Sequence, residues 1–186
     1  MKSQTHGKFY WDTEALIVVG LFTALNKVAS LLVALVGGGM NPITLLLKNG
    51  VATALLIVMV ARVRRFGTLA LYTLVGQVIS FLMAGGAMIA LLPAFLLAAL
   101  LSDALIAVTG GYTRLRSVVF GIVLYDFLGR GLSLLFSWMN VREAPGMFVF
   151  GAIMVAFGYL GCLLIGLPCG VKFVKELRHA GIIREI

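Results

Sequence analysis

The sequence predicts an all-α membrane protein with six transmembrane helices and with both termini in the cytoplasm. Of its 186 residues, 61% are hydrophobic and 12% are charged, whereas soluble domains are about 45–50% apolar and about 25% charged. The hydrophobic residues also gather in runs long enough to cross a bilayer, and most basic residues flank these runs on one side. We therefore expect one integral membrane domain, residues 1–186, that crosses the cell membrane several times.

The hydrophobic runs set the expected helix boundaries. A helix needs about 20 apolar residues to cross roughly 30 Å of hydrocarbon, so the run 68–109 is too long for one crossing. The glycines and Pro93 of "AGGAMIALLP" favour a break inside this run. The expected helices are 15–36, 43–61, 68–86, 90–109, 118–139 and 147–171, followed by a polar tail.

The basic residues predict the orientation. Six crossings place both termini on one side, and only Arg142 falls in a connection on the other side. Because Lys and Arg collect on the cytoplasmic side of membrane proteins, the termini are expected in the cytoplasm. This topology accounts for the net charge of +8, and no nucleic-acid partner is expected. The basic residues on the cytoplasmic side are Lys2, Lys8, Arg62, Arg64, Arg65, Arg114, Arg116, Lys172, Lys175, Arg178 and Arg184.

Five ionisable residues fall inside the expected helices: Lys27, Lys48, Asp103, Asp126 and Arg130. Each costs roughly 2.5–3.5 kcal/mol at a helix centre, so such residues usually face a bundle interior or a wet cavity and indicate function. Asp103 falls toward the cytoplasmic end of its helix. The other four lie in the middle or outer part of their helices, and we expect them to converge on a cavity that opens outward.

Asp126 and Arg130 are four residues apart and are expected to pair directly. With three bases and one acid, the predicted cavity suits a solute that has a carboxylate or phosphate group. Alternatively, the four charges are structural ion pairs, for example Lys27 with Asp126, that hold the bundle together. We interpret Asp126 as mainly structural and Arg130 as the stronger candidate for contact with a ligand.

Other residues extend this candidate site. Methionines near the outer side suit an adaptable apolar pocket; they could also coordinate a soft metal, but plain packing is favoured, and no metal or cofactor is predicted. The methionines placed in the site are Met40, Met88 and Met139. Three lone polar residues are interpreted as hydrogen-bond contacts between helices: Asn26, Asn49 and Gln77.

Small residues indicate close helix contacts. In the sixth expected helix, Gly158, Cys162, Gly166 and Gly170 recur every four residues, which allows close packing against a helix of the same chain. In the first helix, Gly20 and Ala24 form a small-xxx-small pair that is a candidate for docking a partner.

Several catalytic patterns are missing from the sequence. It contains no GxxxxGK[ST], HExxH or GxSxG motif, and both histidines fall in the tails. We therefore expect neither ATP hydrolysis by a P-loop in this chain nor any other enzymatic activity.

Two short motifs add to these observations: "NP" at Asn41 and Pro42, and the tail "GVKFVKELRHAGI" at residues 170–182. With the chain length and the six expected spans, they resemble the substrate-binding membrane subunits (S components) of energy-coupling factor (ECF) transporters, and among these the Trep_Strep-type membrane proteins. The resemblance implies an S-component-like helix bundle in a prokaryotic plasma membrane, surrounded by lipid.

The resemblance also implies a mechanism. Such a subunit captures a small micronutrient, for example a vitamin-like, flavin-like or haem-like molecule, on the outer face. It delivers the solute together with a membrane coupling subunit and two cytoplasmic ATPases. The loop after the first helix, here "GGGMNP" with Met40 and Asn41, would cap the site, and Gly20 and Ala24 would face the coupling subunit in place of the family's AxxxA motif.

Two alternatives stay open. A self-sufficient small transporter or channel would be favoured by inverted repeats, and none is visible in the sequence. A structural membrane subunit without a ligand would use the charges inside the helices only for packing. The sequence does not identify the solute.

Overall fold

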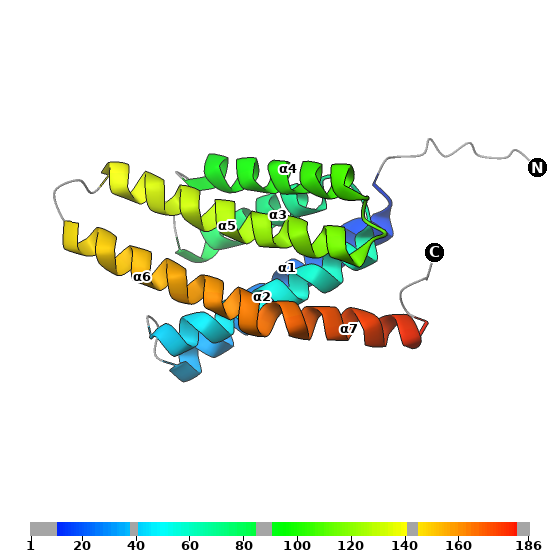
Figure 1. Ribbon diagram of the computed structural model, residues 1–186, viewed down its shortest axis with the longest axis horizontal. Helices are drawn as coiled ribbons and strands as arrows, with labels where there is room; N and C mark the ends of the chain where they lie inside the picture. Colours follow the sequence, from blue (N-terminus) through cyan, green and yellow to red (C-terminus); the bar gives the residue numbers. More distant parts are fainter. Residues whose placement is uncertain (1–10, 38–40, 85–90, 141–144, 182–186) are drawn as a thin grey trace, which may run out of the picture.

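The computed structural model describes residues 11–37, 41–84, 91–140 and 145–181, and these residues form a helix bundle (Figure 1). The described segments contain no strand, so the all-α class is confirmed for them. The elements are α1 (Thr13–Gly37), α2 (Pro42–Val63), α3 (Thr68–Ala84), α4 (Leu92–Thr109), α5 (Leu115–Asn140), α6 (Pro145–Gly161), the π-helical η2 (Cys162–Gly166) and α7 (Leu167–His179). Because α6, η2 and α7 follow one another without a gap, they form one long rod.

Five helical stretches are long and apolar enough to cross a membrane. They lie in α1, α2, α4, α5 and the α6–α7 rod, where the stretch is Phe148–His179. The remaining helix, α3, is apolar over Thr68–Met83 but has only 17 residues, which span about 25 Å at 1.5 Å per residue. The structure therefore confirms five of the expected crossings by length and composition, and the sixth stays a prediction.

The predicted boundaries agree with the structure except at the C-terminal end. The run 68–109 is divided as expected, since it contains two separate helices, α3 and α4, that pack against each other. The last helix was expected to end at residue 171, but the rod continues to His179. This continuation is amphipathic: Gly170 and Val174 are buried, and α7 packs against α2. Burial of one apolar face stabilises a helix whose other face is polar.

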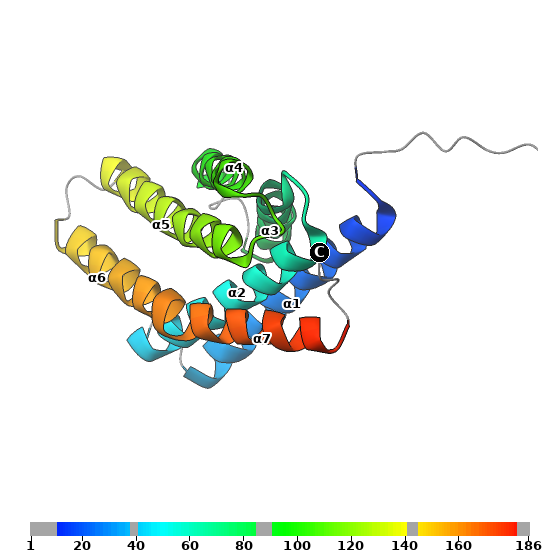
Figure 2. The ribbon, with the colours of Figure 1, turned by 45° about the vertical axis from the view of Figure 1, so that its right-hand side comes forward.

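The central element of the bundle is α2, which packs against α1, α5 and the α6–α7 rod. In both views α5 and α6 lie side by side, while α4 packs against α3 and α5 (Figures 1 and 2). The rod approaches α2 very closely, because a Cβ atom on Gly161 would lie 2.3 Å from the backbone oxygen of Leu46. One on Gly166 would lie 2.6 Å from Cβ of Thr53. The predicted packing of the small-residue stripe against a helix of the same chain is thus confirmed.

The two ends of the bundle differ in charge. The start of α1, the end of α7 and the connections α2–α3 and α4–α5 lie at the same end (Figures 1 and 2). We call this the basic end, because most basic residues of the described segments lie on it: Arg62, Arg64, Arg65, Arg114, Arg116, Lys172, Lys175 and Arg178. Which side of the membrane the basic end faces remains the prediction made from these charges.

Candidate functional site

The bundle contains a cavity of about 420 Å³, which falls in the size range of small-molecule sites, about 300–1,000 Å³. Helices α1 to α6 all contribute to its lining. Apolar lining comes from Ala52, Leu56, Phe95 and Val155, among others. The polar side chains are Lys27, Asn49, Tyr72, Thr73, Gln77, Ser80, Tyr125, Asp126, Arg130 and Ser133.

The cavity brings together three of the four charged residues that were expected to converge. Lys27, Asp126 and Arg130 line it. The expectation is wrong for Lys48, which is exposed and does not line the cavity. Neighbouring residues on a helix point about 100° apart, and in α2 the next residue, Asn49, points into the cavity. Lys48 therefore points about 100° around the helix from Asn49.

Asp126 and Arg130 form the predicted pair, but the contact is long. Arg130 Nη2 lies 3.7 Å from Asp126 Oδ1, whereas charge-assisted N–H···O contacts are about 2.7–2.9 Å. Asp126 is held more closely by Thr53, whose Oγ1 donates to Asp126 Oδ2 at 2.8 Å. Lys27 does not pair with Asp126 among the described contacts; its Nζ donates to Ser80 Oγ at 2.5 Å. The alternative pairing considered from the sequence is thus not formed.

Arg130 has further neighbours on the α6–α7 rod. Its Nη2 donates to Cys162 Sγ at 3.6 Å, and its guanidinium carbon lies 5.9 Å from the centre of the Tyr159 ring, within reach of a cation–π contact. Cys162 Sγ also lies 3.0 Å from Thr53 Oγ1, whose one hydrogen is directed to Asp126. These contacts hold the arginine side chain between α5, α2 and the rod.

Two buried nitrogen atoms at this place have no hydrogen-bond partner among the described residues: Asn49 Nδ2 and Arg130 Nε. Such unsatisfied buried donors are rare and need an explanation. Both side chains lie against Gly158, because a Cβ atom there would be 2.7 Å from Arg130 Nη1 and 2.9 Å from Asn49 Nδ2. We call this place the Asn49–Arg130 corner. The interpretation of Asn49 as an interhelical hydrogen-bond contact finds no support at its amide nitrogen, whereas Asn26 does donate to Tyr72 Oη across α1 and α3.

Sequence reasoning missed Thr53, Tyr159 and the contact role of Cys162. Thr53 was detectable in principle, since it lies one turn after Asn49 on the same face of α2. The geometry at Cys162 depends on η2, where Leu167 N donates to Cys162 O, a π-helical contact. The signal for η2 is Pro168, which lacks an N–H group and disturbs the regular pattern. Such π-helical turns are frequent at functional sites.

The remaining predicted site residues lie elsewhere. Asn41 caps α2, with its Oδ1 accepting from Ile43 N at 3.4 Å, and it lines a separate apolar pocket between α1 and α2 of about 440 Å³. The side chain of Met139 is exposed. Met40 and Met88 lie outside the described residues. The cavity therefore has no methionine in its described lining, and its character is more polar than predicted.

Asp103, the fifth ionisable residue within the helices, has a structural role. It is fully buried, and its Oδ2 accepts from the backbone nitrogens of Leu69 (3.2 Å) and Ala70 (3.3 Å). Its Oδ1 accepts from Tyr112 Oη at 2.7 Å. Gly67, just before α3, has no side chain to cap the helix, so α4 supplies the cap through Asp103.

The small residues of α1 face away from the bundle. Nothing lies within 4 Å of a Cβ atom built on Gly20, and Ala24 is exposed. This surface is therefore accessible, and its predicted role in docking a partner stays a prediction.

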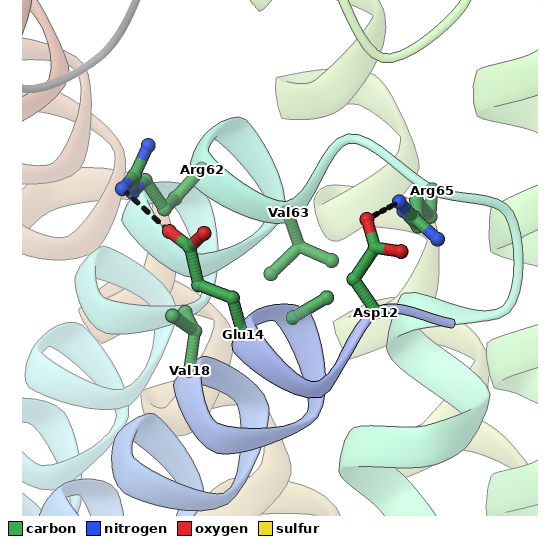
Figure 3. Close-up of a pocket in the computed structure, with 7 residues that line it drawn as sticks. Asp12, Glu14, Val18, Arg62, Val63 and Arg65 are labelled. Atoms are coloured by element: carbon green, nitrogen blue, oxygen red, sulfur yellow. Dashed lines mark hydrogen bonds and ion pairs between the residues drawn. The ribbon is translucent and has the colours of Figure 1, made fainter. Parts of the chain in front are cut away.

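A third, smaller pocket of about 150 Å³ lies at the basic end (Figure 3). Arg62 Nη2 lies 3.1 Å from Glu14 Oε1, and Arg65 pairs with Asp12. Both pairs are largely exposed and join the start of α1 to the end of α2 (Figure 3). Within the described segments, no three His, Cys, Asp or Glu side chains gather as they would around a metal ion.

A comparison with models of known protein families covers most of the helix bundle. A family model described as a hypothetical bacterial integral membrane protein (Trep_Strep) matches residues 13–144. That range covers α1 to α5 and therefore Lys27, Asn49, Asp126 and Arg130, but not Gly158 or the rod. Comparisons with curated proteins and with solved structures gave no match. With its several membrane-length helices, the chain is a multi-pass protein of the bacterial cell membrane and belongs to the Trep_Strep family of hypothetical integral membrane proteins.

Proposed function

We propose that this protein is the solute-binding membrane subunit of an ECF-type importer. The observation that supports this most strongly is the cavity, in which two cationic side chains and the two unpaired donors of the Asn49–Arg130 corner meet. A purely structural bundle would gain stability by filling this space and by pairing these donors. The bound solute is a small micronutrient, and the surrounding partner is membrane lipid.

The position of the cavity supports capture from outside the cell. In α3, Gln77 and Ser80 lie in the half of the helix away from the basic end, and in α5 so do Arg130 and Ser133. With six crossings and the basic end in the cytoplasm, these residues belong to the outer half of the membrane. The solute then enters from the outer face, as proposed for an uptake protein.

The energy for uptake has to come from partners. The sequence contains no P-loop motif, so we assign ATP hydrolysis to two cytoplasmic ATPases that act through a membrane coupling subunit. Gly20, which has open space beside it, and the exposed Ala24 offer a smooth surface on α1 for that subunit, because small residues let helices approach closely.

Bulky substitutions on α1 test the proposed docking of the coupling subunit. The double variant Gly20→Leu, Ala24→Leu should abolish ATP-dependent uptake into reconstituted vesicles and leave solute retention by the purified subunit unchanged. The matched control is Ala104→Leu, Ala107→Leu on α4, two exposed small residues of another helix, and it should keep both activities.

Other outcomes separate the alternatives. Uptake by the isolated chain without ATPases would identify a self-sufficient transporter. A wild-type protein that retains no small molecule at all would contradict a solute-binding role and favour a structural subunit.

A further inference from the structure

We propose that the Asn49–Arg130 corner binds a carboxylate group, and that the solute of this cavity is a small monoanion. This inference rests on the proposed solute-binding function and adds the chemical class of the solute and the place where its charge is held.

The two unpaired nitrogens define the binding point. Asn49 Nδ2 and Arg130 Nε are buried donors without acceptors among the described residues, and both residues line the cavity. Arg130 Nη1 and Asn49 Nδ2 lie close enough together to touch the same Cβ position at Gly158. A carboxylate has two acceptor oxygens, so one such group can satisfy donors from α2 and α5 at once.

The neighbouring contacts leave Arg130 available for this role. Its contact with Asp126 is long, at 3.7 Å, and Asp126 already accepts from Thr53. An arginine fork recognises carboxylates through two parallel N–H···O contacts. Cys162 and Tyr159 hold the guanidinium in place, so the side chain is preorganised when the solute arrives.

The charges of the lining limit the net charge of the solute. Lys27, Arg130 and Asp126 are the charged residues of the described lining, which gives an excess of one positive charge. Burying an uncompensated charge away from water costs free energy. A solute with one negative charge brings the net charge of the lining and the solute to zero. A second negative charge would be repelled by Asp126, and a cation or a neutral amide would leave the excess charge without a partner.

Gly158 offers a test that alters no polar group. In Gly158→Ala, the new methyl group would lie 2.7 Å from Arg130 Nη1 and 2.9 Å from Asn49 Nδ2. Both atoms belong to side chains rather than to the backbone, so the methyl group displaces these two donors from their contacts rather than the helix. The matched control is Gly151→Ala on the same helix, where the nearest atom is Leu134 Cδ1 at 3.4 Å, an ordinary contact.

The experiment incubates each detergent-purified protein with a soluble bacterial metabolite extract and identifies the retained molecules by mass spectrometry. Wild type and Gly151→Ala should retain a carboxylate with one negative charge at neutral pH. Gly158→Ala should retain it at least about tenfold less, as expected for the loss of a hydrogen bond to a charged group, and should unfold at the same temperature as the control.

The outcomes separate this inference from the proposed function. Retention of a neutral, cationic or dianionic molecule, or equal retention by Gly158→Ala, would overturn the carboxylate corner and leave solute binding intact. Retention of nothing by wild type would contradict both.

Discussion

Two acids within the membrane-spanning helices, Asp103 and Asp126, have opposite surroundings. Both carboxyl oxygens of Asp103 accept hydrogen bonds, two from the backbone of α3 and one from Tyr112. Asp126 has one close donor, Thr53, and a long contact to Arg130. Asp103 does not line the cavity of about 420 Å³, whereas Asp126 does.

The difference shows that an ionisable residue within a membrane helix is not by itself a sign of function. Asp103 replaces a missing helix cap, because Gly67 has no side chain. Arg130, in contrast, keeps a donor without an acceptor. The number of unmet hydrogen bonds, together with adjacent space, distinguishes a candidate binding group from a structural one.

The largest expected effect is the loss of stability in Asp103→Ala. One buried and two partly buried donors lose their acceptor, each at about 1–3 kcal/mol, so we expect a loss of about 2–5 kcal/mol, allowing for relaxation. Asp103→Asn keeps an acceptor and a capping side chain and should lose about 1 kcal/mol. Unfolding in SDS titrations measures both. A stable Asp103→Ala protein that no longer retains solute would move Asp103 into the binding site.

The second expected effect is a stability that is unchanged or higher than that of wild type. Replacing the pair with apolar residues, in Asp126→Leu, Arg130→Met, should leave stability unchanged or raise it by up to about 4 kcal/mol, as found for other buried ion pairs. Solute retention should disappear. Arg130→Met alone leaves Asp126 without a cation and should be less stable than the double variant.

The double variant also tests whether the Asp126–Arg130 pair serves solute binding or holds the bundle together. If it were less stable than wild type by more than about 2 kcal/mol, outside the range expected from replaced pairs, the Asp126–Arg130 pair would be a structural contact. The two acids would then have the same role.

The smallest expected effect is that of Arg62→Ala at the basic end. The pair with Glu14 is largely exposed, and such pairs contribute about 0.2–1 kcal/mol. Retention of solute should be unchanged, since Arg62 does not line the cavity. A clear loss of retention in this variant would mean that charge far from the cavity controls binding.

Much of the fold was predictable because hydrophobic runs and breaks determine membrane helices. The runs gave the helices and the break between α3 and α4. They did not give the extension of the last helix to His179, because residues 172–179 are polar on average and become helical by burying Val174 against the bundle.

The site was predictable in part. Charge within hydrophobic runs identified Lys27, Asp126 and Arg130, and all three line the cavity. Hydrophobicity is nearly uniform around α2, so the sequence does not indicate which of its side chains point into the bundle. For this reason Lys48 was predicted to line the cavity, whereas the next residue, Asn49, does so. Thr53 and Cys162 were missed because their contacts depend on packing between α2, α5 and η2.

The most direct test of the solute-binding role is an experimental structure of the purified protein with its retained molecule bound. We predict that the molecule lies in the cavity, with carboxylate oxygens at hydrogen-bond distance, about 3 Å, from Arg130 Nε and Asn49 Nδ2. A molecule bound elsewhere, for example in the apolar pocket lined by Leu32 and Leu47, with both nitrogens still unpaired, would contradict this account.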